Sequence, residues 1–138
     1  MKTLYIDIEM APNLGGFWGL IDQSLSPAHI LEPNYVLCVS WKWRDQAKVY
    51  FVSEFHNGRE EMIRAAHGAL DQADTVVHYY GKRFDIPSLN REFAKLQLQP
   101  PSPFHELDLL STIRRKFRFP SNKLGYVVQE LGVGQKLP

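Results

Sequence analysis

Apolar and polar positions along the chain predict alternating strands and helices. Residues 3–9 repeat with period two and place Leu4, Ile6 and Ile8 on one face, which predicts a first strand with one apolar side. Residues 35–43 and 48–53 are rich in β-branched and aromatic residues and are joined by a short polar link. We therefore expect these two segments to form an antiparallel hairpin.

Residues 11–33 show no clear period and are rich in Pro, Gly and Ser, so we expect a long irregular excursion that lies over a site, with Trp18 as its largest apolar group. The later elements alternate in type. They are a helix over 60–73 with Asn57 as N-cap, a strand over 75–79, a helix over 86–96, a strand over 106–110, a helix over 111–117, and a helix over 124–131 with Ser121 as N-cap and Gly132 as its end.

This order of elements predicts an α/β domain. Three antiparallel strands followed by βα crossovers give a mixed five-stranded sheet flanked by helices. A chain of 138 residues with 44% hydrophobic content fits one domain with a real core. The single cysteine, Cys38, lies in an apolar run and excludes an internal disulfide. No signal peptide or membrane-spanning run is recognisable, and we expect a cytoplasmic protein that is not bound to a membrane.

The charge pattern is uneven, although the formal net charge is only +1. This near-neutral balance argues against a module whose only task is tight nonspecific nucleic-acid binding. A basic cluster nevertheless interleaves with Phe117 and Phe119; its members are Arg114, Arg115, Lys116, Arg118 and Lys123. The cluster is either a phosphate-contacting edge or a solvated helix end whose two aromatic residues belong to the core.

Asp7 and Glu9 lie two residues apart on the first predicted strand. Their side chains project from the same face, roughly 6.5 to 7 Å apart along the backbone. Two carboxylates on a half-buried face repel each other and lose hydration unless a cation or hydrogen-bond donors compensate. Mg²⁺ and Mn²⁺ are the usual compensation, because they prefer carboxylate oxygen and keep positions open for phosphate. In the alternative, this face is wet and the two acids only cap a strand edge.

Asp85 follows the strand over 75–79 and immediately precedes a helix. An acid in this position is commonly an N-cap or a first-turn residue. If the strand lies parallel beside the first one, a carboxylate just past its end sits near Asp7, where open α/β sheets bind ligands. Lys82 and Arg83 in the same turn could balance charge or hold phosphate.

The string Asp7-Ile8-Glu9 and the segment 80–87, Tyr-Gly-Lys-Arg-Phe-Asp-Ile-Pro, resemble the first two motifs of the DEDD family of 3′–5′ exonucleases. The fold that this resemblance implies is ribonuclease H-like. The chain is similar to the branch that includes the exonuclease domains of family B DNA polymerases in segments 108–110, 114–117, 121–124 and 130–132. The resemblance covers nearly the whole chain, and it is specific for the combination of motifs.

The resemblance implies hydrolysis of phosphodiester bonds at single-stranded 3′ ends, of DNA rather than RNA, with two Mg²⁺ or Mn²⁺ ions. Asp7 would bridge both ions, and Glu9 and Asp85 would complete the shell together with substrate phosphate. The catalytic and metal-binding residues are therefore expected to be these three acids. The candidates for substrate contacts are Met10, Tyr80, Lys82, Arg83 and Lys123.

The sequence departs from the family pattern in two places. The family often has Asn where Tyr80 stands, so the contacts of that turn differ. A third motif should bring a fourth Asp on a later helix, near a Tyr or His, and the chain ends before it. We therefore expect residues 1–138 to be one exonuclease-like domain without that motif. Asp108 corresponds to the family's strand aspartate, and His78 and His105 to ordinary polar or partly buried residues.

Two other functional classes stay open at this point. One is a noncatalytic nucleic-acid-binding or interaction module that keeps the fold and has lost the complete site. The other is a structure-specific endonuclease, because the same fold carries endonucleases and resolvases. Metal-dependent release of mononucleotides separates an exonuclease from the first class, and a circular single-stranded substrate separates it from the second. The sequence does not predict the oligomeric state.

Overall fold

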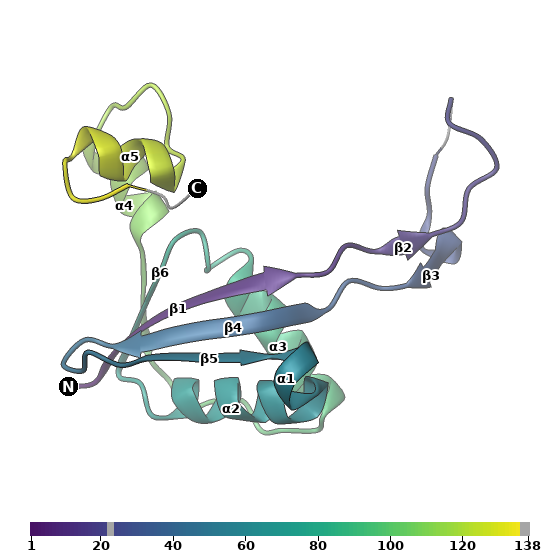
Figure 1. The fold of residues 1–138 in the computed structure, drawn as a ribbon, viewed down its shortest axis with the longest axis horizontal. Helices are drawn as coiled ribbons and strands as arrows, with labels where there is room; N and C mark the ends of the chain where they lie inside the picture. Colours follow the sequence, from purple (N-terminus) through teal and green to yellow (C-terminus); the bar gives the residue numbers. More distant parts are fainter. Residues whose placement is uncertain (22–23, 136–138) are drawn as a thin grey trace.

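A mixed sheet of five strands forms the centre of the molecule (Figure 1). The computed structural model describes residues 1–21 and 24–135, and the end of the predicted domain, Pro138, lies outside these ranges. The strands are β1 (Thr3–Met10), β4 (Val36–Trp43), β5 (Val49–Ser53), β6 (Thr75–His78) and β7 (His105–Asp108). Their order is β5-β4-β1-β6-β7. The strands β5, β4 and β1 pair antiparallel, and β6 and β7 add in parallel, as predicted.

Two helices, α2 (Arg59–Asp71) and α3 (Asp85–Lys95), cover one face of the sheet (Figure 1). The alternation predicted for β1 is confirmed on this face, where Leu4, Ile6 and Ile8 are at most 5% exposed. The helices bury their own apolar stripes against these residues; those stripes are Met62, Ala66 and Leu70 in α2 and Ile86, Leu89 and Phe93 in α3. Burial of this apolar surface between the sheet and the two helices is the main stabilising contribution to the fold.

The opposite face of the sheet is largely uncovered, and we call it the open face. Tyr5 pairs with Lys42 across the β1–β4 ladder, and Phe51 of β5 is 57% exposed there. The helices α4 (Leu109–Lys116) and α5 (Leu124–Glu130) lie on this side (Figure 1). None of the helices in the described ranges is long and apolar enough to span a membrane.

The segment predicted to lie over a site instead forms an arm that projects away from the main sheet (Figure 1). The β1–β4 pairing continues beyond the sheet as β2 (Leu14–Gly15) and β3 (Ile30–Glu32), with a short 3₁₀ helix, η1 (Pro27–His29), before β3. Backbone bonds continue the ladder, so this arm extends in line with the two strands. Trp18 is 98% exposed near its tip.

The predicted N-cap at Asn57 is wrong. A short helix, α1 (Glu54–Asn57), precedes α2, and the N-cap of α2 is Gly58 with φ +80°. Ser53 caps α1 by accepting a bond from the His56 N–H. The Asn57 side chain folds back and accepts a bond from the Ser53 N–H, so it is not free to cap α2.

The predicted N-cap of the last helix, Ser121, is wrong for a similar reason. The helix α5 has Lys123 in the N-cap position, and the Ser121 hydroxyl accepts a bond from the Lys123 N–H within the preceding loop. The predicted end of the helix is confirmed, because Gly132 follows it with φ +65°, a conformation that favours glycine.

Candidate active site

Asp7 and Glu9 lie on the open face of β1, where the alternation of the strand places them. Asp7 pairs with Ser40 and Glu9 with Cys38 on β4. Burial raises the pKa of the Asp7 carboxyl, and the Glu9 carboxylate raises it further, against a lowering by the Ile8 backbone. The two carboxylates are therefore close enough to repel each other through the protein.

Asp85 is the first residue of α3 and is only 4% exposed. The parallel pairing of β1 with β6 carries the start of this helix to β1. Burial raises the pKa of the Asp85 carboxyl from 3.8 to about 7, and the carboxylate of Asp7 is the next cause. The Ile8 backbone acts against them and lowers the pKa, and Glu9 and Asp108 raise it by smaller amounts. The structure thus brings Asp85 next to the acids of β1, and Asp85 Oδ2 is buried without a hydrogen-bond partner.

The turn between β6 and α3 is held by a close contact of Gly81 with His78. The Gly81 N–H donates to His78 Nδ1 at 3.0 Å. A β-carbon at Gly81 would lie 2.4 Å from His78 Cγ, so no other residue fits here without rearrangement. The Ile86 N–H then bonds back to the Gly81 carbonyl. Because burial lowers the pKa of His78, its ring is neutral, and it serves as an anchor of the turn that positions Asp85.

A second anchor of the same turn is Asp108, at the end of β7. Its Oδ1 accepts the Tyr80 N–H at 2.8 Å and the Leu110 N–H at 3.0 Å. Asp108 is the N-cap of α4, which begins at Leu109. The strand predicted over 106–110 runs past this position, so this cap was not predicted from the sequence. The available signal was an Asp, a preferred N-cap residue, just before a segment with helical periodicity. Tyr80 itself has φ +70°.

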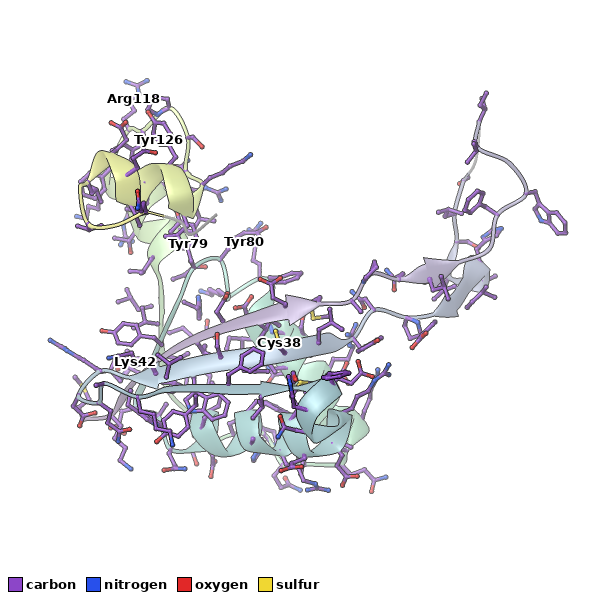
Figure 2. All side chains as sticks on the ribbon, viewed as in Figure 1. Cys38, Lys42, Tyr79, Tyr80, Arg118 and Tyr126 are labelled. Atoms are coloured by element: carbon purple, nitrogen blue, oxygen red, sulfur yellow. The ribbon has the colours of Figure 1, made fainter. Side chains whose placement is uncertain are left out.

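The residues expected to contact substrate occupy different surroundings. Met10 is partly buried and packs against the core. Lys82 and Arg83 are exposed on the turn before α3, and Lys123 is exposed at the start of α5. Tyr80 is 42% exposed on the turn that faces α4 and α5 (Figure 2).

Sequence reasoning gave no function to Tyr79, which links the turn to the C-terminal helices. Its hydroxyl donates to the Asn122 carbonyl, just before α5. A cleft of about 550 Å³ lies beside it between the turn and α4–α5; its lining residues are Tyr79, Tyr80, Leu110, Arg114, Asn122 and Lys123. A second cavity of about 340 Å³ also contacts Tyr79, and Asp7 lines that cavity. Tyr79 thus lines both the cavity that contains Asp7 and the cleft that contains Arg114 and Lys123.

The basic cluster lies at the C-terminal end of α4 and in the loop that follows. Arg114, Arg115 and Lys116 form the last turn of the helix and are exposed. Phe117 and Phe119 stack on each other with ring centroids 5.4 Å apart, and Phe117 is 46% exposed. The alternative in which both aromatic residues belong to the core is therefore wrong.

The family assignment rests on most of the chain. Residues 28–138 match the family model of the RNase_H superfamily. The chain belongs to the RNase_H superfamily. Its mixed sheet with three antiparallel strands is consistent with this fold. Among curated proteins, none matches the sequence.

Solved structures resemble this RNase_H superfamily chain at the level of the fold. The family B DNA polymerase of the hyperthermophilic archaeon Pyrobaculum calidifontis superposes with a TM-score of 0.68 at 18% identity, covering 97% of this chain and 18% of the polymerase chain. The RNase D of Trypanosoma brucei, solved in complex with RNA U12, gives a TM-score of 0.54 at 16% identity, covering 97% of this chain and 41% of that one. The chain therefore spans a minor part of both proteins, and the resemblance inferred from the motifs is confirmed for the fold.

The donor set of the acidic site suits a hard divalent cation, although the side chains do not converge. Across residues 1–21 and 24–135, no three His, Cys, Asp or Glu side chains are close enough together to hold a metal ion. The unpartnered Asp85 Oδ2 beside Asp7 is, however, the kind of buried oxygen that a cation would satisfy. A cation bound beside Asp7 and Asp85 in this RNase_H superfamily member would offset the repulsion between their carboxylates.

Proposed function

We propose that this chain is a metal-dependent 3′–5′ exonuclease that hydrolyses phosphodiester bonds, with Asp7, Glu9 and Asp85 as its metal ligands. The observation that supports this most is the buried, unpartnered Asp85 Oδ2 beside Asp7 in a chain of the RNase_H superfamily. A buried carboxylate oxygen without a donor is costly to maintain, and a divalent cation is the compensation that also provides nuclease chemistry.

Each acid has a distinct task in this proposal. The carboxylate of Glu9 raises the pKa of Asp7, and the carboxylate of Asp7 raises that of Asp85 more than Glu9 does, so Asp7 is the acid suited to bridge two ions. Two ions of Mg²⁺ or Mn²⁺ would supply an activated water and stabilisation of the leaving 3′ oxygen. Glu9 and Asp85 would hold the ions against the substrate phosphate. Asp108 is not suited to be a further ligand, because its Oδ1 already accepts two backbone N–H groups.

The proposed substrate is a single-stranded 3′ end of nucleic acid. Two of the similar structures are a DNA polymerase and an RNase D bound to RNA, so both DNA and RNA are represented. We propose DNA as the preferred substrate, as the motif resemblance implies. Because the chain spans only part of those proteins, the test should compare both nucleic acids directly.

A noncatalytic nucleic-acid-binding module is the second candidate. Two observations favour it: the carboxylates do not converge, and a basic cleft shares Tyr79 with the cavity that Asp7 lines. This module would bind single strands and would not hydrolyse them under any metal condition.

The decisive experiment measures products from a 5′-labelled single-stranded oligonucleotide in Mn²⁺, in Mg²⁺ and in EDTA. We expect metal-dependent shortening from the 3′ end with release of mononucleotides. A circular strand of the same sequence should stay intact, and its cleavage would support an endonuclease instead. No release in any metal, with the strand still bound, would support the noncatalytic module.

Asp7→Ala is the matching variant for this experiment. We expect activity to fall by several orders of magnitude, because metal ions supply several kcal/mol of transition-state stabilisation and each ~1.4 kcal/mol is tenfold in rate. The thermal midpoint without metal should stay level or rise, since the change relieves repulsion between acids. A clear drop in midpoint together with intact activity would show that Asp7 is a structural residue.

A further inference from the structure

We propose that the cleft between the 79–81 turn and α4–α5 holds single-stranded nucleic acid, with Tyr80 as a stacking platform for one base and Arg114 and Lys123 as phosphate contacts. This inference rests on the proposed function and specifies how the strand is held. It concerns Tyr80, where the related family often has Asn, so it assigns a contact that the motif pattern does not supply.

The backbone of Tyr80 is held in an energetically unfavourable conformation. A residue with a β-carbon at φ +70° is in the left-handed region, which is unfavourable for a bulky side chain. Two anchors impose this conformation: the Asp108 carboxylate, which accepts the Tyr80 N–H, and the contact of Gly81 with His78. The result is a fixed backbone from which the aromatic ring, 42% exposed, lines the cleft rather than packing in the core.

The cleft combines this ring with positive charge. Arg114 from α4 and Lys123 from the start of α5 line the same cleft as Tyr80, and none of its six lining residues is acidic. The bond from the Tyr79 hydroxyl to the Asn122 carbonyl ties the two walls together, so the cleft exists without a ligand. A basic groove with an aromatic platform is the common arrangement for binding single strands.

The position of the cleft fits a strand whose 3′ end reaches the acidic site. Tyr79 lines both this cleft and the cavity that Asp7 lines. A strand held by Tyr80 and passing Tyr79 would therefore present its end to the acids of β1. A base stacks on a protein ring only when it is unstacked from its neighbours, so the cleft suits single strands and not a duplex.

Fluorescence anisotropy in EDTA tests binding without hydrolysis, using 5′-fluorescein-labelled dT12 and rU12. We expect Tyr80→Ala to weaken binding about tenfold and Tyr80→Phe to bind as wild type, because the stack needs only the ring. Tyr80→Gly removes the ring and also relieves the backbone, so a loss equal to that of Tyr80→Ala, with an unchanged or higher thermal midpoint, would exclude misfolding. Arg64→Ala on α2 is a distant charge control and should bind as wild type.

Two further measurements distinguish the base contact of Tyr80 from the phosphate contacts of Arg114 and Lys123. A 12-nucleotide strand with abasic sites should bind wild type and Tyr80→Ala equally, because it has no base to stack. Arg114→Ala and Lys123→Ala should each reduce the slope of log K against log salt by about 0.7, the value for one phosphate contact on a single strand. The relative affinities for dT12 and rU12 show whether the cleft prefers DNA or RNA.

The outcomes distinguish this inference from the proposed function. If Tyr80→Ala binds dT12 and rU12 as tightly as wild type does, the stacking platform is wrong even where wild type releases mononucleotides in Mn²⁺. If binding depends on Tyr80 and no metal supports hydrolysis, the exonuclease proposal is wrong and the cleft assignment stands. If wild type binds neither strand in EDTA, the cleft assignment is wrong, and hydrolysis in Mn²⁺ alone decides the exonuclease proposal.

Discussion

Asp85 and Asp108 are both buried aspartates at helix N-termini, beyond or at the carboxyl ends of the neighbouring parallel strands β6 and β7, and they differ in how their oxygens are bonded. Asp108 caps α4 and accepts two backbone N–H groups on one oxygen. Asp85 is buried still further, yet its Oδ2 has no partner. Burial and neighbouring carboxylates raise the pKa of Asp85 to about 7, so its surroundings disfavour the charged form and the carboxyl keeps its proton far above the ordinary pKa of 3.8.

The two acids differ in that the hydrogen bonds of Asp108 give it a structural role, whereas the unpartnered oxygen of Asp85 is suited to bind a ligand. Buried polar groups in proteins usually have hydrogen-bond partners, as Asp108 does, and a buried group without a partner needs an explanation. The other buried atom without a partner in the described ranges is Nε2 of His78, on a neutral ring that belongs to the anchor of the turn. Asp85 is therefore the acid whose substitution should affect chemistry more than stability.

The sharpest test of this contrast compares Asp85→Asn with Asp108→Asn. Asparagine keeps a carbonyl oxygen, so Asp108→Asn can keep both backbone bonds on its Oδ1, whereas Asp85→Asn loses a charged metal ligand. We expect mononucleotide release per folded molecule to fall by several orders of magnitude for Asp85→Asn and by less than tenfold for Asp108→Asn. Equal losses in the two variants would remove the distinction between the acids.

Stability should respond in the opposite order. Asp108→Ala leaves the Tyr80 and Leu110 N–H groups without their acceptor and removes the cap of α4, which should cost about 1 to 3 kcal/mol. Denaturant unfolding in EDTA at pH 7 measures this cost as a lower midpoint with an unchanged slope. Asp108→Asn is the control and should recover most of the loss. An Asp85→Ala variant as unstable as Asp108→Ala would contradict the contrast.

The sequence was sufficient to predict which residues of β1 are buried under the helices. It was insufficient to predict the backbone of the turn at Tyr80 and the N-caps of two helices. The period-two alternation of β1 predicts both its buried aliphatic face and the open face with Asp7, because alternation follows directly from strand geometry. The turn at Tyr80 could not be predicted, because its left-handed backbone depends on Asp108, 28 residues later in the chain. The N-caps at Asn57 and Ser121 failed because side chains of these types also bond within loops.

The arm formed by residues 11–33 shows a further limit of prediction from the sequence. Residues 11–33 carry the composition of a loop, and only the pairing of β2 with β3 shows that the β1–β4 ladder continues through them. The direction of the arm, away from the main sheet (Figure 1), follows from that long-range pairing. Composition alone cannot give a direction.

The dependence of stability on pH should reveal Asp85 directly. Its folded pKa of about 7 lies above the ordinary 3.8, so between these values the folded state keeps a proton that the unfolded state has released. Its contribution to stability is fully present below pH ~4 and is lost as pH rises through about 7, at most about 1.4 kcal/mol per pH unit. Burial lowers the pKa of His78, which acts in the opposite sense, so the measured quantity is the difference between wild type and Asp85→Asn. Identical pH slopes for both proteins would contradict the raised pKa.

The smallest expected effect is stabilisation of the protein by Mn²⁺. The ion binds the ionised carboxylates and competes with the proton on Asp85, so binding should be stronger at pH 8 than at pH 5.5. The second ion of the proposed pair also needs the substrate phosphate, which is absent from this experiment. We therefore expect the three acids to form one weak site, with stabilisation of about 1 kcal/mol when Mn²⁺ exceeds its Kd several-fold. Thermal unfolding measures the shift, which should vanish in Asp85→Asn and persist in Asp108→Asn, because Asp108 uses its oxygen for backbone bonds. Calorimetry that finds two tight sites would show that the acids already converge, and an equal loss of the shift in both variants would make Asp108 a ligand after all.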